Sequence, residues 1–212
     1  MAAMLGKVRN KQHSATLLGR VFSNVVWLLG GKGFGAICSL VYLGILTRSL
    51  GVKGFGHFSL IFGTSQALIA LAGFQTWRVV VRYGAEHVHR KDWGAFGRLG
   101  MLCGLLDIVG AIAGCLVAYL AFYQFADALD LNRKLIDTAF WFNIAAVWAV
   151  VSAPTGIVRA LDRFDVAVYV EAMVPLLRLG AAVTIWLNEP SLAKFLLAWA
   201  AIDLLESAAY WI

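Results

Sequence analysis

Six long apolar stretches dominate this sequence and constrain its fold more than any other feature. They cover residues 21–46, 57–79, 99–123, 139–158, 166–187 and 192–212. A helix needs about 20 mostly apolar residues to cross the roughly 30 Å hydrocarbon core of a bilayer, and each stretch meets that length. Six such helices packed in a soluble core would leave too little polar surface to face water. The sequence therefore predicts an all-α, polytopic membrane protein with six transmembrane helices.

The composition supports this class and excludes others. Of the 212 residues, 61% are hydrophobic and 14% are charged, whereas soluble domains average about 45–50% and about 25%. An ordinary soluble enzyme and a disordered chain are both excluded. Cys38, Cys103 and Cys115 lack metal-binding spacing, and no catalytic constellation stands in a polar connection. We therefore expect no enzymatic activity, no catalytic residues, no cofactor and no metal.

The basic residues fall unequally between the two predicted sides of the membrane. Eleven of the 18 lie in the tail at residues 1–20 and in the second and fourth connections, whereas five lie in the other three connections. Cytoplasmic loops carry the excess of lysine and arginine. The tail and the C-terminus are therefore predicted to be cytoplasmic, and the net charge of +6 indicates membrane orientation rather than a nucleic-acid partner.

Several ionisable side chains lie inside the predicted spans, where a charge costs at least about 2.5–3.5 kcal/mol. They are Lys32, Asp107, Glu171, Arg178, Asp203 and Glu206. Asp203 and Glu206 share one face of the sixth helix, and the short connection at 188–190 makes this helix an antiparallel neighbour of the fifth. Arg178 can therefore pair with either acid, while Glu171 lies on the same face of the fifth helix as Arg178, two turns away.

Two interpretations of these charges remain open. In the first, they neutralise one another and lock the bundle. In the second, Lys32 and Arg178 face a cavity and bind an anionic group such as phosphate. Small residues at Gly31, Gly35 and Ser39, and again at Gly110 and Gly114, predict faces where helices approach one another closely.

Residues 47–56 read Thr-Arg-Ser-Leu-Gly-Val-Lys-Gly-Phe-Gly. This segment resembles the R-x-LG-x-x-x-FG turn after the first helix of bacterial polysaccharide flippases, the Wzx-like branch of the MATE-related MOP exporter superfamily. The further matches are Phe74–Trp77 with Val80–Gly84, Pro154–Arg159 with Asp162–Asp165, and Pro175–Arg178. The resemblance extends from about Trp27 to the last residue.

This resemblance implies one lobe of a MATE-like two-lobe transporter in the bacterial inner membrane. It implies export of a lipid-linked oligosaccharide, usually on undecaprenyl pyrophosphate, by alternating access around a polar cavity. Membrane lipids are the other implied partners. Lys32 and Arg178 are then the candidate substrate-binding cations. Asp107, Glu171, Asp203 and Glu206 are the candidates for ion or proton coupling or for charge pairs.

The chain is shorter than the members of the resembled family, and two other function classes are alternatives to export. Members of the resembled family have about twelve to fourteen spans, so residues 21–212 match only an N-terminal lobe. Such a chain is expected to be truncated or to associate with a second lobe or copy, and truncation is favoured because the sequence ends within an apolar stretch. The alternatives are a MATE-type cation-coupled antiporter of small molecules and a non-transporting membrane scaffold or remnant.

Overall fold

The computed structural model describes residues 2–124, 133–150 and 152–210, with their side chains except at 2–32, 133–134 and 164–165. Within these residues all regular structure is helical. The elements are α1 (Ala2–Ala72), α2 (Thr76–His89), α3 (Trp93–Tyr119), the π-helical turn η1 (Leu120–Gln124), α4 (Arg133–Trp148), α5 (Ser152–Ala160), α6 (Phe164–Leu187) and α7 (Leu192–Ala209). The predicted all-α class is confirmed.

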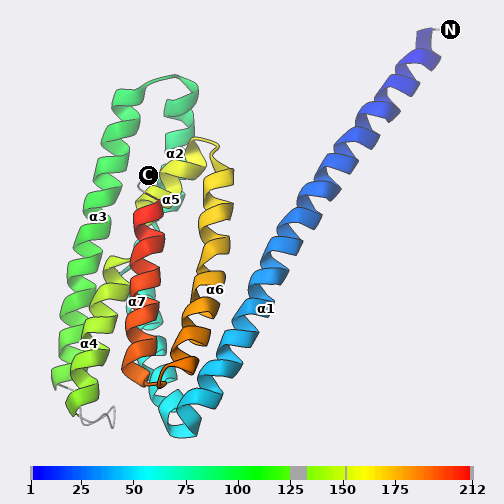
Figure 1. Cartoon of the computed structure of the whole chain (residues 1–212). Coiled ribbons are helices and arrows are strands. Elements are labelled where there is room, and N and C mark those ends of the chain that lie inside the picture. The colour runs from blue at the N-terminus through cyan, green and yellow to red at the C-terminus, as the bar shows by residue number, and fades with distance from the viewer. Residues whose placement is uncertain (1, 125–132, 151, 211–212) are drawn as a thin grey trace.

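Helix α1 bends at a single residue. Gly51 has φ 66° and ψ 179°, a conformation that a residue with a Cβ rarely adopts. The predicted turn at 47–56 is therefore helical on both sides of this glycine (Figure 1). At its other end α1 begins at Ala2, so the basic tail is helical and continues directly into the first predicted span.

The second predicted span, 57–79, is interrupted. α1 ends at Ala72, and α2 begins at Thr76 after Gln75 adopts the left-handed conformation with φ 48°. The apolar pattern predicts one uninterrupted helix over 57–79, and this prediction is wrong because the helix is broken between Ala72 and Thr76. A further difference is that Arg78 and Arg82, expected in a connection, lie on α2, which extends to His89.

The fourth predicted span, 139–158, is also broken: α4 ends at Trp148 and α5 begins at Ser152. Pro154 lies in the first turn of α5, where the missing proline N–H removes no helical hydrogen bond. An apolar run does not reveal such a break, because hydropathy is the same in a continuous helix and in two consecutive ones.

The number of spans is only partly settled by length and composition. Four helical stretches with described side chains are long and apolar enough to cross a membrane: Gly33–Ala72, Trp93–Gln124, Leu135–Ala160 and Val166–Leu187. The first of these is bent at Gly51, and the third contains the break between α4 and α5. α7 has 18 residues and carries Lys194, Asp203 and Glu206. The division into six spans stays a prediction.

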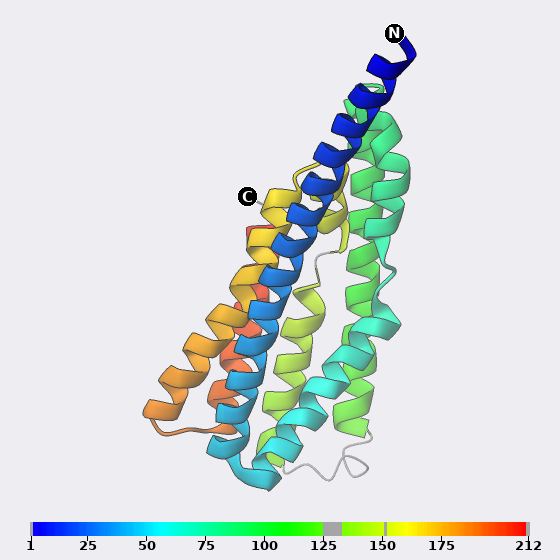
Figure 2. The same cartoon turned by 90° about the vertical axis from the view of Figure 1, so that its right-hand side faces the viewer.

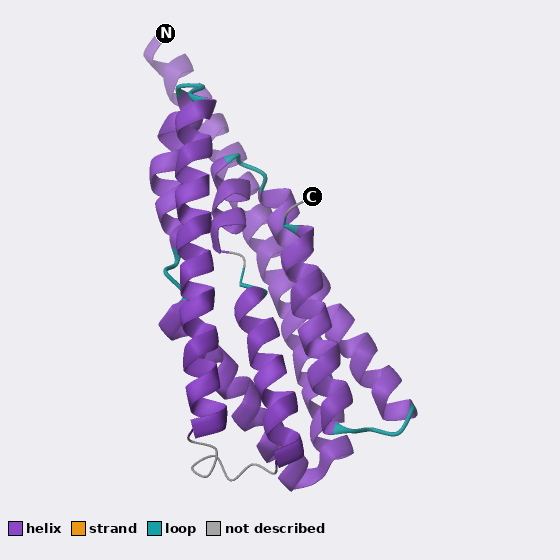
Figure 3. Cartoon of the chain, turned by 90° about the vertical axis from the view of Figure 1, so that its left-hand side faces the viewer, coloured by secondary structure: helices purple, strands orange, loops and turns teal. Residues whose placement is uncertain are grey.

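The connections alternate between the two ends of the bundle (Figures 1 and 2). The α2–α3 and α5–α6 connections lie at one end, whereas the bend of α1 and the α6–α7 connection lie at the other. Figure 3 shows the helices running between these ends, and Figure 1 shows the N-terminal part of α1 inclined away from the others. Successive connections were assigned to opposite sides of the membrane when the basic residues were counted, and this arrangement agrees with that assignment.

Apolar contacts and glycines hold the helices together. The largest buried cluster includes Ile61, Phe195 and Trp199, and a second cluster joins α2, α3 and α5. A Cβ at Gly110 of α3 would lie 2.3 Å from the backbone oxygen of Ala72. The predicted close approach at the second glycine stripe is therefore present, and it fixes the end of α1 against the middle of α3.

Candidate functional site

Arg178 of α6 and Asp203 of α7 form an ion pair between neighbouring antiparallel helices. Arg178 Nη2 donates to Asp203 Oδ1 over 2.6 Å, and the two side chains are only 16% and 18% exposed. The pairing expected from the spacing of these residues is thus present. Because the pair lies within apolar helices, each charge offsets much of the desolvation cost of the other.

Aromatic rings enclose the same guanidinium group. Its carbon lies 5.9 Å from the ring centroid of Phe62 on α1 and 5.7 Å from that of Trp199 on α7. At these distances a cation is attracted to the ring faces. Arg178 Nε is buried and has no hydrogen-bond partner. The group is therefore held in place by rings and one carboxylate, with a donor left unused.

The other acids on α6 and α7 behave differently. Glu171 accepts a hydrogen bond from Arg159 Nη2 of α5 over 3.1 Å, and this pair is considerably more exposed, at 48% and 28%. Glu206 lies three residues after Asp203 and forms no ion pair with the side chains that the structure describes. These three acids and the two arginines form what we call the α6–α7 cluster: Glu171, Asp203, Glu206, Arg178 and Arg159 of the adjoining α5.

Asp107 lies elsewhere, at the junction of both broken spans. Its Oδ1 accepts a hydrogen bond from Thr76 Oγ1 over 2.7 Å, and its Oδ2 accepts one from the backbone N–H of Ala153 over 2.8 Å. Thr76 opens α2, and Ala153 is the second residue of α5. The carboxylate of α3 therefore stabilises two helix N-termini, where backbone N–H groups and a partial positive charge favour an anion.

Further contacts tie α2 to α5 at this junction. Ser152 Oγ lies 2.9 Å from Thr76 Oγ1 and accepts a hydrogen bond from the backbone N–H of Trp77. A Cβ at Gly156 would lie 2.8 Å from Trp77 Cα, so only glycine permits this approach. The segments Phe74–Trp77 and Pro154–Arg159, which carry two parts of the family resemblance, are therefore packed directly against each other.

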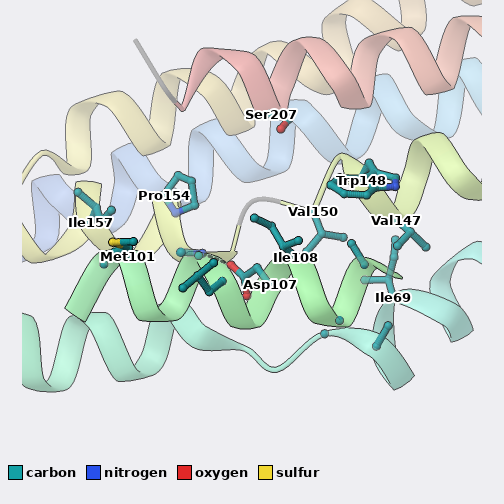
Figure 4. Close-up of a pocket in the computed structure, with 18 of the residues that line it drawn as sticks. Ile69, Met101, Asp107, Ile108, Val147, Trp148, Val150, Pro154, Ile157 and Ser207 are labelled. Carbon is teal, nitrogen blue, oxygen red and sulfur yellow. Dashed lines mark hydrogen bonds between the residues drawn. The ribbon is translucent and has the colours of Figure 1, made fainter. Parts of the chain in front are cut away.

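A cavity of about 560 Å³ adjoins the junction. Figure 4 shows α3 along one side of it, with Met101, Asp107 and Ile108, and the α4–α5 region along another, with Trp148 and Pro154. Among the described residues that line it, Asp107 is the one that carries a charge; the others are apolar or glycine, apart from Ser207 of α7. Neither Arg178 nor Asp203 lines this cavity.

The sequence prediction captured some of these residues and missed others. Lys32 lies on α1, but its side chain is outside the described residues. The remaining five candidates fall into the α6–α7 cluster and the Asp107 junction. Thr76 and Ser152, 1% and 8% exposed, were missed. Ser152 followed closely by Pro154 is a helix-start signal, and Gly73 is a helix-end signal, so these residues could have indicated the breaks.

The bundle of long apolar helices, with Arg178, Asp203 and Asp107 at helix–helix contacts, defines a multi-pass membrane protein. The chain belongs to the polysaccharide biosynthesis protein family, whose model matches residues 21–211. It is 29% identical over 198 residues to the inner membrane protein YghQ of Escherichia coli strain K12. This match covers 90% of the chain and 54% of the relative, so the chain spans about half the length of that protein.

The comparisons confirm the predicted kind of family and the predicted location in the bacterial inner membrane. The cytoplasmic position of the N-terminus stays a prediction. No solved structure matches the chain.

Proposed function

We propose that the chain forms the N-terminal lobe of an exporter that moves a lipid-linked oligosaccharide from the inner to the outer leaflet. Three findings support this proposal: membership of the polysaccharide biosynthesis family, the bundle of membrane-length helices, and a buried arginine with an unused donor. The last observation carries it, because a pyrophosphate-linked lipid needs a cation within the membrane.

Arg178 is the proposed contact for pyrophosphate. Only Nη2 is engaged by Asp203, whereas the buried Nε has no partner. A guanidinium group presents its N–H donors in a planar fork that binds two phosphate oxygens at once. Asp203 holds the cation while no substrate is bound, since an unpaired charge at this position would be costly. Substrate phosphate then competes with Asp203 for the same group.

The acids on α7 are the proposed coupling groups. When Arg178 turns towards phosphate, Asp203 loses its cation while Glu206, three residues away, has no described ion-pair partner. Two neighbouring carboxylates in an apolar surrounding then favour uptake of a proton or another cation. In this scheme Glu171 stays paired with Arg159, and Lys32 supplies a second cation to the substrate. Asp107 has no role in the coupling.

Transport requires a second wall around the substrate. We assign that wall to a second lobe or a second copy of the chain, moving against this lobe by alternating access. The predicted orientation places the N-terminal tail in the cytoplasm, where the substrate is loaded. Membrane lipids surround the remaining apolar faces, which expose large side chains such as Leu71 and Leu102, at 80% and 61%.

Binding of undecaprenyl pyrophosphate tests the role of Arg178 directly. Native mass spectrometry of the protein in nanodiscs compares undecaprenyl pyrophosphate with uncharged undecaprenol. We expect the wild type to prefer the pyrophosphate, and Arg178→Ala to weaken its binding by about tenfold or more. The control is Arg98→Ala, since Arg98 is exposed on α3. Equal binding by folded Arg178→Ala and wild type would contradict the assignment.

A further inference from the structure

Aromatic side chains gather where α3 ends and α4 begins. Tyr119 is the last residue of α3, Tyr123 lies in the π-helical turn η1, and Phe140 and Trp141 are consecutive residues of α4. The ring centroid of Tyr123 lies 5.3 Å from that of Tyr119 and 5.2 Å from that of Phe140. The centroids of Phe140 and Trp141 are 5.6 Å apart. These four rings therefore form one continuous group, which we call the aromatic platform.

Much of the aromatic platform is open to the surroundings of the bundle. Tyr119, Tyr123 and Trp141 are 48%, 42% and 66% exposed. Contacts among the rings hold the platform together but leave a large part of these three side chains uncovered. The π-helical turn that carries Tyr123 is a rare form of backbone that often marks a functional site. The exposed rings are therefore available to a ligand.

A carboxylate lies beside the platform. Asp137 is exposed on α4, one helical turn before Trp141. Tyr123 Oη donates a hydrogen bond to Asp137 Oδ1 over 2.8 Å. A carboxylate can accept about four hydrogen bonds, so this bond alone does not use its capacity. An interfacial belt of tyrosine and tryptophan needs no such carboxylate, and the platform therefore combines ring faces with a polar group that can orient a ligand.

Sugars have the chemistry that complements this combination. The C–H groups on one face of a pyranose ring are apolar and slightly positive, so they pack on the electron-rich face of an aromatic ring. The hydroxyl groups at the rim of the sugar donate hydrogen bonds, and a carboxylate is a strong acceptor for them. Because Asp137 is negatively charged, it repels acidic sugars, so the platform favours neutral ones.

The platform also lies at the end of the bundle where an exported glycan would emerge. The end of α3 and the start of α4 lie at the same end as the bend of α1 and the α6–α7 connection (Figures 1 and 2). The distribution of basic residues predicts that this end is periplasmic. Since the chain belongs to a polysaccharide biosynthesis family, a glycan is the sugar-bearing ligand expected there.

We propose that the aromatic platform binds a neutral sugar residue of the glycan, which stacks on Trp141 and the two tyrosines and donates hydrogen bonds to Asp137. This inference rests on the proposed export function for the origin of the glycan. The site is separate from the proposed pyrophosphate contact, because Arg178 lies between α6 and α7, whereas the platform is built on α3, η1 and α4. The two sites can therefore be tested independently.

Saturation-transfer difference NMR tests this site with the full chain in phosphatidylcholine nanodiscs, which contain no sugar. The probes are cellotetraose, a neutral oligosaccharide, and tetragalacturonic acid, an acidic one of the same length. We expect saturable binding of cellotetraose by the wild type. Binding of the acidic tetramer is expected to be weaker by about tenfold or more, because its carboxylates approach Asp137.

Two variants at exposed positions separate stacking from charge. Trp141→Ala removes the most exposed ring and is expected to weaken cellotetraose binding about threefold to tenfold. Its control is Trp186→Ala, because Trp186 is 52% exposed near the α6–α7 connection and takes part in none of the ring contacts among the described residues. Asp137→Asn keeps an oxygen that accepts from Tyr123 and removes the charge, so it should bind both tetramers to a similar extent.

The proposal is overturned if the folded wild type shows no saturable binding of cellotetraose. Equal binding by Trp141→Ala and Trp186→Ala also overturns it, because the platform would then be an interfacial belt only. Equal binding of both tetramers by the wild type would contradict the choice of neutral sugars. Undecaprenyl pyrophosphate carries no sugar, so an intact preference for it without cellotetraose binding contradicts this inference alone. The reverse result contradicts the pyrophosphate contact and leaves the sugar site standing.

Discussion

Arg178 Nη2 and Asp203 Oδ1 are 2.6 Å apart and join α6 to α7 inside the bundle. Removing one partner leaves the other charge buried and unpaired, which costs about 3–5 kcal/mol, whereas replacing both with apolar residues is often neutral. We expect Arg178→Met and Asp203→Leu each to lower the thermal unfolding temperature in detergent. The double variant should recover most of the loss. Additive losses in the double variant would show that the two side chains are not coupled.

The contact between Gly110 and Ala72 fixes the point where α1 ends against α3. Because a Cβ at Gly110 would lie 2.3 Å from a backbone oxygen, Gly110→Ala forces the two helices apart. We expect a large loss of folded protein, measured by size-exclusion chromatography after detergent extraction. Gly63→Ala, where the added Cβ meets nothing within 4 Å, should elute as the wild type does. A normal profile for Gly110→Ala would argue against the close helix approach.

The hydrogen bonds of Asp107 lock the starts of α2 and α5. Asp107→Ala leaves the Thr76 hydroxyl and the Ala153 N–H without their acceptor, at a cost of about 1–3 kcal/mol. Hydrogen–deuterium exchange should therefore accelerate in peptides covering 76–80 and 153–157. Peptides from α6 should be unaffected, because the described hydrogen bonds of Asp107 go to Thr76 and Ala153 and not to that helix. Unchanged exchange at both helix starts would contradict the bridging role.

The predicted orientation is checked by cysteine labelling in intact cells. Lys91 and Glu189 are exposed in connections at opposite ends of the bundle. We expect Glu189→Cys to react with a membrane-impermeant maleimide from outside and Lys91→Cys to react only after lysis, since the richer basic side faces the cytoplasm. Both are made in a variant without the three native cysteines. A reporter fused within 127–134, of which 127–132 lie outside the described residues, should likewise be periplasmic. The reverse pattern would invert the topology.

The sequence predicted the helical class and one ion pair because both depend on simple spacing. Apolar runs of about 20 residues specify membrane helices, and a short connection after Leu187 leaves α6 and α7 as antiparallel neighbours. Arg178 and Asp203 were therefore placed correctly within reach of each other. Glu171 was expected on the face of Arg178; its ion pair with Arg159 across the α5–α6 connection was not predicted.

The two helix breaks could not be predicted from hydropathy. Ala72, Trp148 and their neighbours are as apolar as a helix interior, so the pattern shows no interruption. The breaks depend on tertiary contacts: Asp107 and Ser152 satisfy backbone groups that a continuous helix would satisfy itself. The position of Asp107 at both helix starts, and the cavity beside it, follow from these breaks and were missed for the same reason.

The leaflet distribution of a labelled lipid-linked oligosaccharide tests the proposed export function most directly. The measurement compares cells that express the protein as the organism makes it with cells that lack it or carry Arg178→Ala. We predict outer-leaflet accumulation only with the wild type, while Arg178→Ala inserts normally in the membrane and exports little. An unchanged distribution with the wild type, accompanied by raised resistance to cationic drugs, would contradict export of the oligosaccharide and favour a small-molecule antiporter.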